Sequence, residues 1–420
     1  MGWDNPAVTS PSQTPDAPVD LPTLADIWRA RELLKGVIDP TPLGIDRFLS
    51  DRVGAPVYVK CENLQRTGSF KVRGAYVRIA GLTDDERAQG VVAASAGNHA
   101  QGVALAASKL NCRSTVFMPE NASIPKVNAT ATYGADVRLV EGSLEEAIAA
   151  AEAFSRETGA VLIHPFNHPD VIAGQGTIGL EILDEVPDVK TIVTCVGGGG
   201  LLAGIAIAAK STRPEVRVVG AQSAAVPGVA ASLAAGHVVS VDALPTMADG
   251  IAVSRPGEVP FRAVQSLVDE VVTLSEASLA RGLLHSLERT KLLVEPAGAA
   301  GVAAVLDNPG AFEGPVVVVL SGGNVDPLLL MRVLRYGMAS AGRFLQLQLW
   351  LSDRPGSLAG LLRVLGQERA NIIAIEHRRI DPRLEIDEVE VSLQLETRGP
   401  EHCDEVLVAL AEAGYRVVVD

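Results

Sequence analysis

The feature that most constrains the fold is an alternation of short β-rich runs with helical segments, which extends from about residue 56 to about residue 320. Runs such as TIVTCV (191–196) and PVVVVL (315–320) contain almost no charged or strongly polar residue, which is typical of strands buried on both faces. The other expected strands are PVYVK (56–60), VVAAS (91–95), STVFM (114–118), ADVRLV (135–140), AVLIH (160–164) and VRVVGAQ (216–222). The pattern predicts an α/β fold of parallel sheets covered by helices, in which ligands bind at the carboxyl ends of the strands.

A different pattern begins near residue 340. Strands and helices follow one another there in the order βαββαβ, which is the ferredoxin-like plan and predicts a small α+β domain over residues 344–420. Before it, residues 22–338 are expected to form one α/β domain of two parallel-sheet subdomains, the smaller inserted at roughly residues 61–165. Residues 1–21 are polar and proline-rich and predict a disordered tail.

Composition excludes several classes of function. A formal net charge of −14 argues against a nucleic-acid or anionic-membrane surface, because phosphates would be repelled. The uncharged stretch between Lys190 and Lys210 contains four consecutive glycines, so a strand, a loop and a buried helix are expected there and not a membrane span. The opening residues show no secretory signal, and four widely separated cysteines without a CxxC pair indicate reduced thiols in a cytoplasmic protein.

Two segments in the first third of the chain have the residues for binding chemistry. GSFKVRGA (68–75) places Lys71 after a small polar stretch at the start of an expected helix, either as a surface lysine or as an amine held inward to form a Schiff base. SAGNHAQG (95–102) opens a helix whose first amides have no partner, so it could bind an anion such as an amino-acid carboxylate. The alternative there is a plain helix cap by Ser95 or Asn98.

Two further segments follow predicted strands. GGGGL (197–201) would let the backbone close tightly around a phosphate at the next helix start; the alternative is a tight turn, which four glycines would make at high entropic cost. Its spacing matches neither a Walker loop nor the GxGxxG of a dinucleotide fold. SGGN (321–324) puts Ser321 at the carboxyl end of a strand, where a hydroxyl could meet a pyridine nitrogen and leave it largely unprotonated; an ordinary turn is again the alternative.

In this order along the chain, the four segments resemble the fold type II family of pyridoxal-phosphate enzymes. The chain is most similar to its threonine dehydratases (threonine ammonia-lyases) with one regulatory domain at the carboxyl end, over roughly residues 22–420. The resemblance implies pyridoxal 5'-phosphate as cofactor, with Lys71 as its Schiff-base lysine and the catalytic base. The other implied cofactor contacts are Asn98 at the phenolic oxygen, Gly197, Gly198, Gly199, Gly200 and Leu201 at the phosphate, and Ser321 at the pyridine nitrogen. The implied substrate contacts are Ser95, Ala96, Gly97 and His99, with Glu295 in VEPAG as a second-rank site residue.

The implied reaction is α,β-elimination of L-threonine to 2-oxobutanoate and ammonia, or of L-serine to pyruvate, in isoleucine biosynthesis. A serine-preferring deaminase and a catalytically silent amino-acid sensor stay open as alternatives, while the loop spacing disfavours a nicotinamide-dependent oxidoreductase. Serine racemases look similar over the same core, but Ala96 stands where they have a catalytic serine. The stretch QSAAVPGVA (222–230) has no carboxylate where such racemases hold a divalent cation, so no metal site is expected.

The carboxyl-terminal domain resembles an ACT domain, a small-molecule sensor that usually pairs with a copy from another subunit. The resemblance implies an amino-acid effector at the loop SDRPGSL, with Asp353, Gly356 and Asn371 as effector-site residues, in a homo-oligomer that is a dimer or a tetramer. The alternative is a purely structural dimerisation module. The residues do not select between isoleucine and valine as effector.

Overall fold

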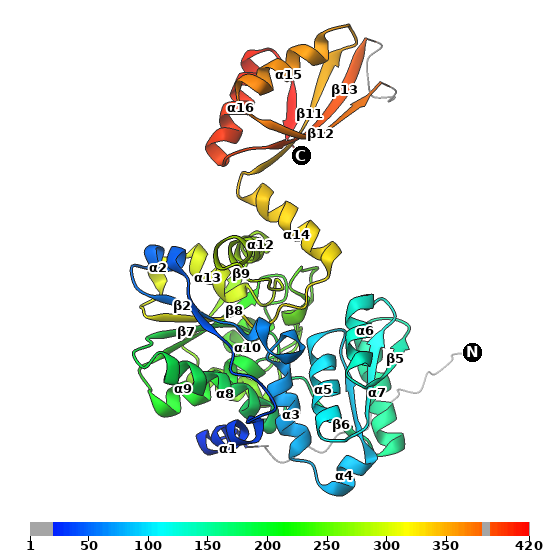
Figure 1. The fold of residues 1–420 in the computed structure, drawn as a ribbon, viewed down its shortest axis with the longest axis vertical. Helices are drawn as coiled ribbons and strands as arrows, with labels where there is room; N and C mark the ends of the chain where they lie inside the picture. The colour runs from blue at the N-terminus through cyan, green and yellow to red at the C-terminus, as the bar shows by residue number, and fades with distance from the viewer. Residues whose placement is uncertain (1–19, 380–386, 420) are drawn as a thin grey trace, which may run out of the picture.

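The fold is described from a computed structural model that covers residues 20–379 and 387–419. The expected disordered tail, residues 1–21, lies outside the described residues except for its last two. A large body and a smaller carboxyl-terminal body are joined by helix α14 (Pro327–Ser340) (Figure 1). The division falls near residue 340, where the pattern of the sequence changes.

The large body is built on a six-stranded sheet in the order β1-β2-β10-β7-β8-β9. Its strands are β1 (Leu43–Ile45), β2 (Val57–Lys60), β7 (Thr191–Cys195), β8 (Arg217–Ser223), β9 (Glu270–Leu274) and β10 (Val316–Val319). Neighbouring strands are parallel except β1 and β2, which pair antiparallel. The four valines of β10 have no exposed surface, because the strand is central and both faces of the sheet are covered. The predicted parallel α/β core is confirmed.

Helices surround this sheet and meet one another through glycines. They are α1 (Leu24–Leu34), α2 (Arg47–Val53), α8 (Pro169–Glu185), α9 (Gly200–Thr212), α10 (Gly228–Ala235), α11 (Glu258–Leu267), α12 (Glu276–His285) and α13 (Ala300–Asp307). A Cβ atom on Gly204 of α9 would lie 2.4 Å from the carbonyl oxygen of Ile172 in α8. A Cβ atom on Gly174 of α8 would lie 2.6 Å from the Cα atom of Gly74 in α3 (Lys71–Ala80). Helices α3, α8 and α9 therefore stack through main-chain contacts that a larger residue would prevent.

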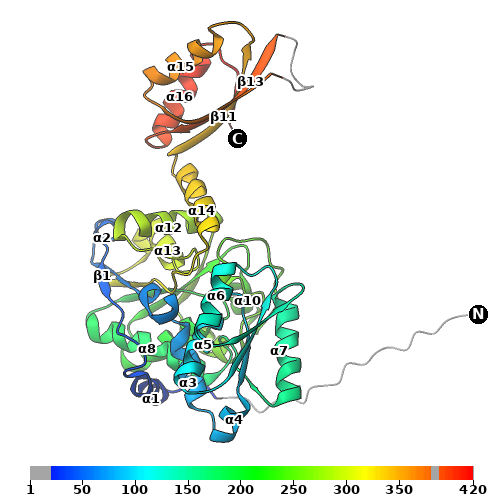
Figure 2. The ribbon, with the colours of Figure 1, turned by 45° about the vertical axis from the view of Figure 1, so that its right-hand side comes forward.

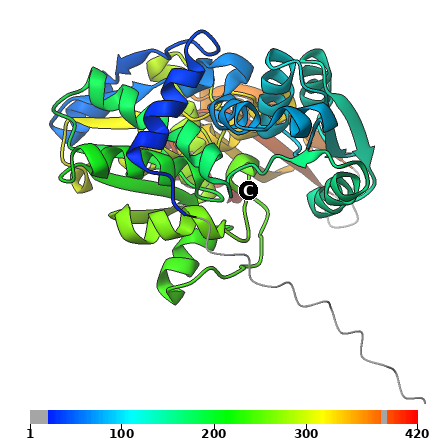
Figure 3. The same ribbon diagram turned by 90° about the horizontal axis from the view of Figure 1, so that it is seen from below.

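The smaller subdomain has a parallel four-stranded sheet in the order β5-β4-β3-β6. Its strands are β3 (Val91–Ala94), β4 (Ser114–Pro119), β5 (Asp136–Val140) and β6 (Val161–Leu162), and its helices are α4 (Asp84–Gln89), α5 (Asn98–Lys109), α6 (Ile124–Thr132) and α7 (Leu144–Thr158). It lies beside the large sheet, and α3 packs between α5 and α8 where the two parts meet (Figures 2 and 3).

The carboxyl-terminal body has the predicted βαββαβ order. Its elements are β11 (Phe344–Ser352), α15 (Ser357–Gln367), β12 (Asn371–Arg378), β13 (Glu388–Glu396), α16 (Pro400–Glu412) and β14 (Val417–Val419). The strands form one antiparallel sheet in the order β12-β13-β11-β14. Its core is separate from that of the large body, whereas Val333 of α14 is buried in the core of the large body. The ferredoxin-like prediction is confirmed.

Two strands of the large sheet were not predicted. β1 has three residues, too few to give a pattern, and β9 (EVVTL) has one buried residue because it is an edge strand. Short irregular helices complete the described chain: the 3-10 turns Glu62–Leu64, Arg66–Gly68, Asp249–Ile251 and Pro309–Ala311, and the π-helical turn Ser286–Thr290.

Candidate active site

The four segments singled out in the sequence line one cavity of about 770 Å³. Lys71, Asn98, the glycine loop 197–201 and Ser321 all contribute to its walls. Each follows or faces the carboxyl end of a parallel strand, which is where α/β sheets bind their ligands. These residues are far apart in the sequence, and they meet because the carboxyl ends of the strands that precede them lie close together.

Lys71 owes its position to a short pairing between two loops. The Phe70 amide donates to the Ser321 carbonyl oxygen over 3.2 Å, and the Gly323 amide donates to the Gly68 carbonyl oxygen over 2.9 Å. This pairing anchors the first residue of α3 to the loop after β10. The Lys71 ammonium donates to the Pro165 carbonyl oxygen over 3.3 Å, and burial lowers its pKa to about 8. An amine with that pKa has a neutral, nucleophilic fraction near neutral pH.

The loop 95–97 leaves the start of α5 without a side-chain cap. Neither Ser95 nor Asn98 caps this helix, so the simpler alternative for this segment is wrong; the Ser95 hydroxyl instead accepts from the Gly97 amide over 3.1 Å. Ala96 and Gly97 line the cavity beside the open helix start. Uncapped amides at a helix start favour an anion, and this arrangement can hold a carboxylate.

Asn98 belongs to a chain of hydrogen bonds that crosses the cavity wall. Its amide nitrogen donates to Glu295 Oε1 over 2.7 Å, and its Oδ1 atom accepts from Asn324 Nδ2 over 2.8 Å. Asn324 also donates to the Thr67 carbonyl oxygen over 2.6 Å. Burial raises the pKa of the Glu295 carboxyl to about 7, and the nearby Asp249 acts in the same direction. Sequence reasoning missed Asn324, although it is the last residue of the SGGN segment.

The glycine loop passes so close to its neighbours that side chains do not fit. A Cβ atom on Gly198 would lie 2.3 Å from the Phe166 ring, and one on Gly200 would lie 3.0 Å from the Cβ of Phe166. Gly199 has a φ of 101° and precedes α9, which has no side-chain cap. Leu201 is buried in the first turn of that helix. The backbone amides are thus the groups that this loop offers to a ligand, as a phosphate cradle requires.

The predicted residue His99 and an ion pair between Lys126 and Asp249 also lie at the cavity. His99 lines the cavity with its ring 2.7 Å from the Ile163 carbonyl oxygen, and burial lowers its pKa to about 3, which favours the neutral ring. Lys126 of α6 forms an ion pair with Asp249 over 3.0 Å, from the smaller subdomain to the large body, and both line the cavity. No local pattern in the sequence pointed to this pair.

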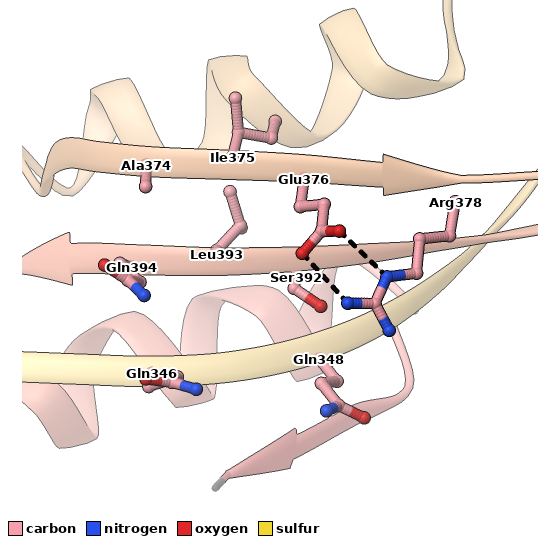
Figure 4. A pocket seen from close by; sticks show the side chains of 9 residues that line it. All are labelled: Gln346, Gln348, Ala374, Ile375, Glu376, Arg378, Ser392, Leu393 and Gln394. Carbon is pink, nitrogen blue, oxygen red and sulfur yellow. Dashed lines mark hydrogen bonds and ion pairs between the residues drawn. The ribbon is translucent and has the colours of Figure 1, made fainter.

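The proposed effector residues do not meet within one chain. Asp353 and Gly356 lie in the loop between β11 and α15, whereas Asn371 begins β12 opposite Glu396, at the other end of the sheet. The open face of this sheet has a second cavity of about 220 Å³, where Glu376 and Arg378 pair with each other (Figure 4).

Two other kinds of site are absent from residues 20–379 and 387–419. These residues contain no cluster of three or more His, Cys, Asp or Glu side chains that could hold a metal ion. They also contain no helix that is both long and apolar enough to cross a bilayer.

The main cavity fits pyridoxal phosphate. It offers an amine that can react with an aldehyde, a glycine loop that has backbone amides and no side chains, and a buried hydroxyl at the end of β10. An aldehyde, a phosphate and a ring nitrogen are the three groups of that cofactor that such residues would bind.

Comparison with known proteins agrees with this chemistry. The family model described as "Pyridoxal-phosphate dependent enzyme" matches residues 34–322. An L-threonine ammonia-lyase of Thermotoga maritima is 45% identical over 395 residues, which are 94% of this chain and 98% of the relative. The catabolic L-threonine dehydratase TdcB of Escherichia coli (strain K12) is 42% identical over 73% of this chain and 94% of its own length. A maize serine racemase structure is 34% identical with a TM-score of 0.72, over 74% of this chain and 97% of that one. The chain therefore belongs to the pyridoxal-phosphate dependent enzyme family.

Proposed function

We propose that this protein is an L-threonine ammonia-lyase, which converts L-threonine to 2-oxobutanoate and ammonia and L-serine to pyruvate. The supporting observation is that one cavity is lined by Lys71, loop 95–98, the glycine loop and Ser321. The names of the Thermotoga maritima and Escherichia coli relatives support threonine as the substrate.

Each residue has a distinct part in the proposed mechanism. Pyridoxal phosphate, when bound, supplies an electron sink for negative charge at the α-carbon of an amino acid. Lys71 would hold the cofactor through its amine, and the same amine, when free, would take the α-proton of the substrate. The amides of loop 197–200 would hold the phosphate, Asn98 would donate to the phenolic oxygen, and Ser321 would meet the ring nitrogen. The β-hydroxyl would leave with a proton, as water, and hydrolysis of the remaining enamine would give the 2-oxo acid and ammonia.

Ala96 bears on the choice between elimination and racemisation. The amides at the start of α5 hold the substrate carboxylate, and Ala96 and Gly97 lie beside it. A methyl group cannot donate or accept a proton, so no base acts from this position on the opposite face of the α-carbon. This favours elimination over the racemase activity named for the maize protein.

The wider biological role is also a proposal. We place the reaction in isoleucine biosynthesis, in the cytoplasm, in a dimer or tetramer whose carboxyl-terminal domains sense an amino-acid effector through the loop with Asp353 and Gly356. Because Asn371 lies at the other end of the sheet, it would reach an effector at this loop only from another subunit.

The test compares the wild type with Lys71→Ala and, as a control, Lys109→Ala, an exposed lysine at the end of α5. We expect wild type and Lys109→Ala to show the visible absorbance of lysine-bound pyridoxal phosphate and to form 2-oxobutanoate from threonine. Lys71→Ala should lose both. A wild type that binds the cofactor but forms no 2-oxo acid from threonine or serine would contradict the lyase assignment and favour a sensor. Formation of D-serine from L-serine would favour a racemase.

A further inference from the structure

Two polar side chains in the cavity wall form a pair that the proposed mechanism does not use. The Cys195 thiol donates a hydrogen bond to Ser321 Oγ over 3.2 Å. Cys195 is 4% exposed and Ser321 is 3% exposed, and both line the cavity. They meet because β7 and β10 are adjacent parallel strands in which Val193 lies opposite Val318. The residues after these two valines therefore lie next to each other at the carboxyl ends of the strands.

The Ser321 hydroxyl has one hydrogen to donate and two lone pairs. Cys195 occupies one lone pair. Within the part of the chain that the structure describes, no other group is hydrogen-bonded to Ser321 Oγ. Since a thiol sulfur is a weak acceptor, the hydroxyl hydrogen is left for a group that enters the cavity.

The thiol is suited to the role of a permanent donor. Burial raises the pKa of Cys195 to about 11, although its hydrogen bond with Ser321 acts in the opposite direction. A thiol that keeps its proton at neutral pH always has a hydrogen to donate. A serine hydroxyl at this position could donate in the same way, so serine is the conservative replacement.

We infer that Cys195 is a positioning residue, which fixes the rotation of the Ser321 hydroxyl so that Ser321 donates to the ring nitrogen of bound pyridoxal phosphate. The inference rests on the proposed function, because the cofactor brings the acceptor. A donor at this point requires a nitrogen with a free lone pair and so keeps that nitrogen unprotonated. An unprotonated ring is a weaker electron sink, which suits elimination better than transamination.

The experiment measures the equilibrium dissociation constant of the apoprotein for pyridoxal phosphate and for 1-deazapyridoxal phosphate, in which a C–H group replaces the ring nitrogen. The variants are Cys195→Ala, Cys195→Ser, Ser321→Ala and the double variant. Cys112→Ala is the matched control, because Cys112 is also buried and its thiol bonds backbone carbonyls away from the cavity. Thermal unfolding of each apoprotein checks that it is folded.

We expect Cys195→Ala to weaken pyridoxal phosphate binding by about threefold to tenfold, the range for one lost hydrogen bond, and to leave the deaza analogue within about twofold. Cys195→Ser should recover most of the affinity, and Cys195→Ala should add no further loss to Ser321→Ala. Equal weakening of both ligands would show that the thiol only packs, and unchanged affinities would also overturn the inference. Failure of the wild type to bind pyridoxal phosphate would instead contradict the proposed function.

Discussion

At the scale of single residues, Glu295 makes the clearest prediction about pH. Its folded-state pKa of about 7 lies above the ordinary value of 4.5. Between pH 4.5 and pH 7 the carboxyl is therefore protonated in the folded apoprotein and ionised in the unfolded chain. The resulting stabilisation is complete below pH 4.5 and is lost as the pH rises through 7. The size of this change is on the order of 3 kcal/mol.

Glu295→Gln removes the titrating group but keeps an oxygen that can accept from Asn98. We therefore expect the variant to lose less free energy of unfolding than the wild-type apoprotein between pH 5 and pH 8, measured by urea denaturation. Glu157→Gln, at an exposed position of α7, is the control and should follow the wild type. Parallel pH curves for wild type and Glu295→Gln would contradict the raised pKa.

The sequence singled out Lys71, the glycine loop and Ser321 because each belongs to a short segment and the order of the four segments resembles one enzyme family. Asn324, Lys126 and Asp249 were not singled out, since their importance comes from contacts between elements that are distant in the chain. Cys195 was read as one of four isolated thiols, because its partner Ser321 comes from a different strand. Tertiary contacts of this kind leave no mark on local sequence.

At the scale of elements, we predict how one added methyl group in the loop between β7 and α9 changes the affinity for pyridoxal phosphate. Gly198→Ala would place a Cβ atom 2.3 Å from the Phe166 ring, so that the ring or the loop must move. We expect affinity for pyridoxal phosphate to fall by about tenfold or more. The control is Gly310→Ala, where an added Cβ atom meets nothing within 4 Å and affinity should not change. Equal affinities for the two variants would rule out close packing as the reason for this glycine.

In the six-stranded sheet, the prediction found the four inner strands and missed the two edge strands. β7 and β10 were recognised because strands buried on both faces must be apolar throughout. The edge strands β1 and β9 have partly exposed residues and no such run. The absence of a side-chain cap on α5 was also beyond local reasoning, because Ser95 and Asn98 have residue types that often cap helices.

At the scale of the whole molecule, the two bodies have separate cores. We expect a chain that ends after Ala341 to fold, to bind pyridoxal phosphate and to deaminate threonine at a rate similar to that of the full chain, but not to respond to an amino-acid effector. An inactive or unfolded product would mean that contacts such as the ion pair of Arg343 with Glu288 are required for the catalytic body.

The glycine contacts between α3, α8 and α9 have a consequence for protein engineering. Replacing a helical glycine by alanine ordinarily raises stability by up to about 1 kcal/mol and is a standard choice in consensus redesign. At Gly74, Gly174 and Gly204 the same change would force apart helices whose main chains touch, and the first of these helices begins with Lys71. Designs for higher thermal stability should therefore keep these three glycines. A rule that replaces helical glycines by alanine would select them first, because they lie in helix interiors.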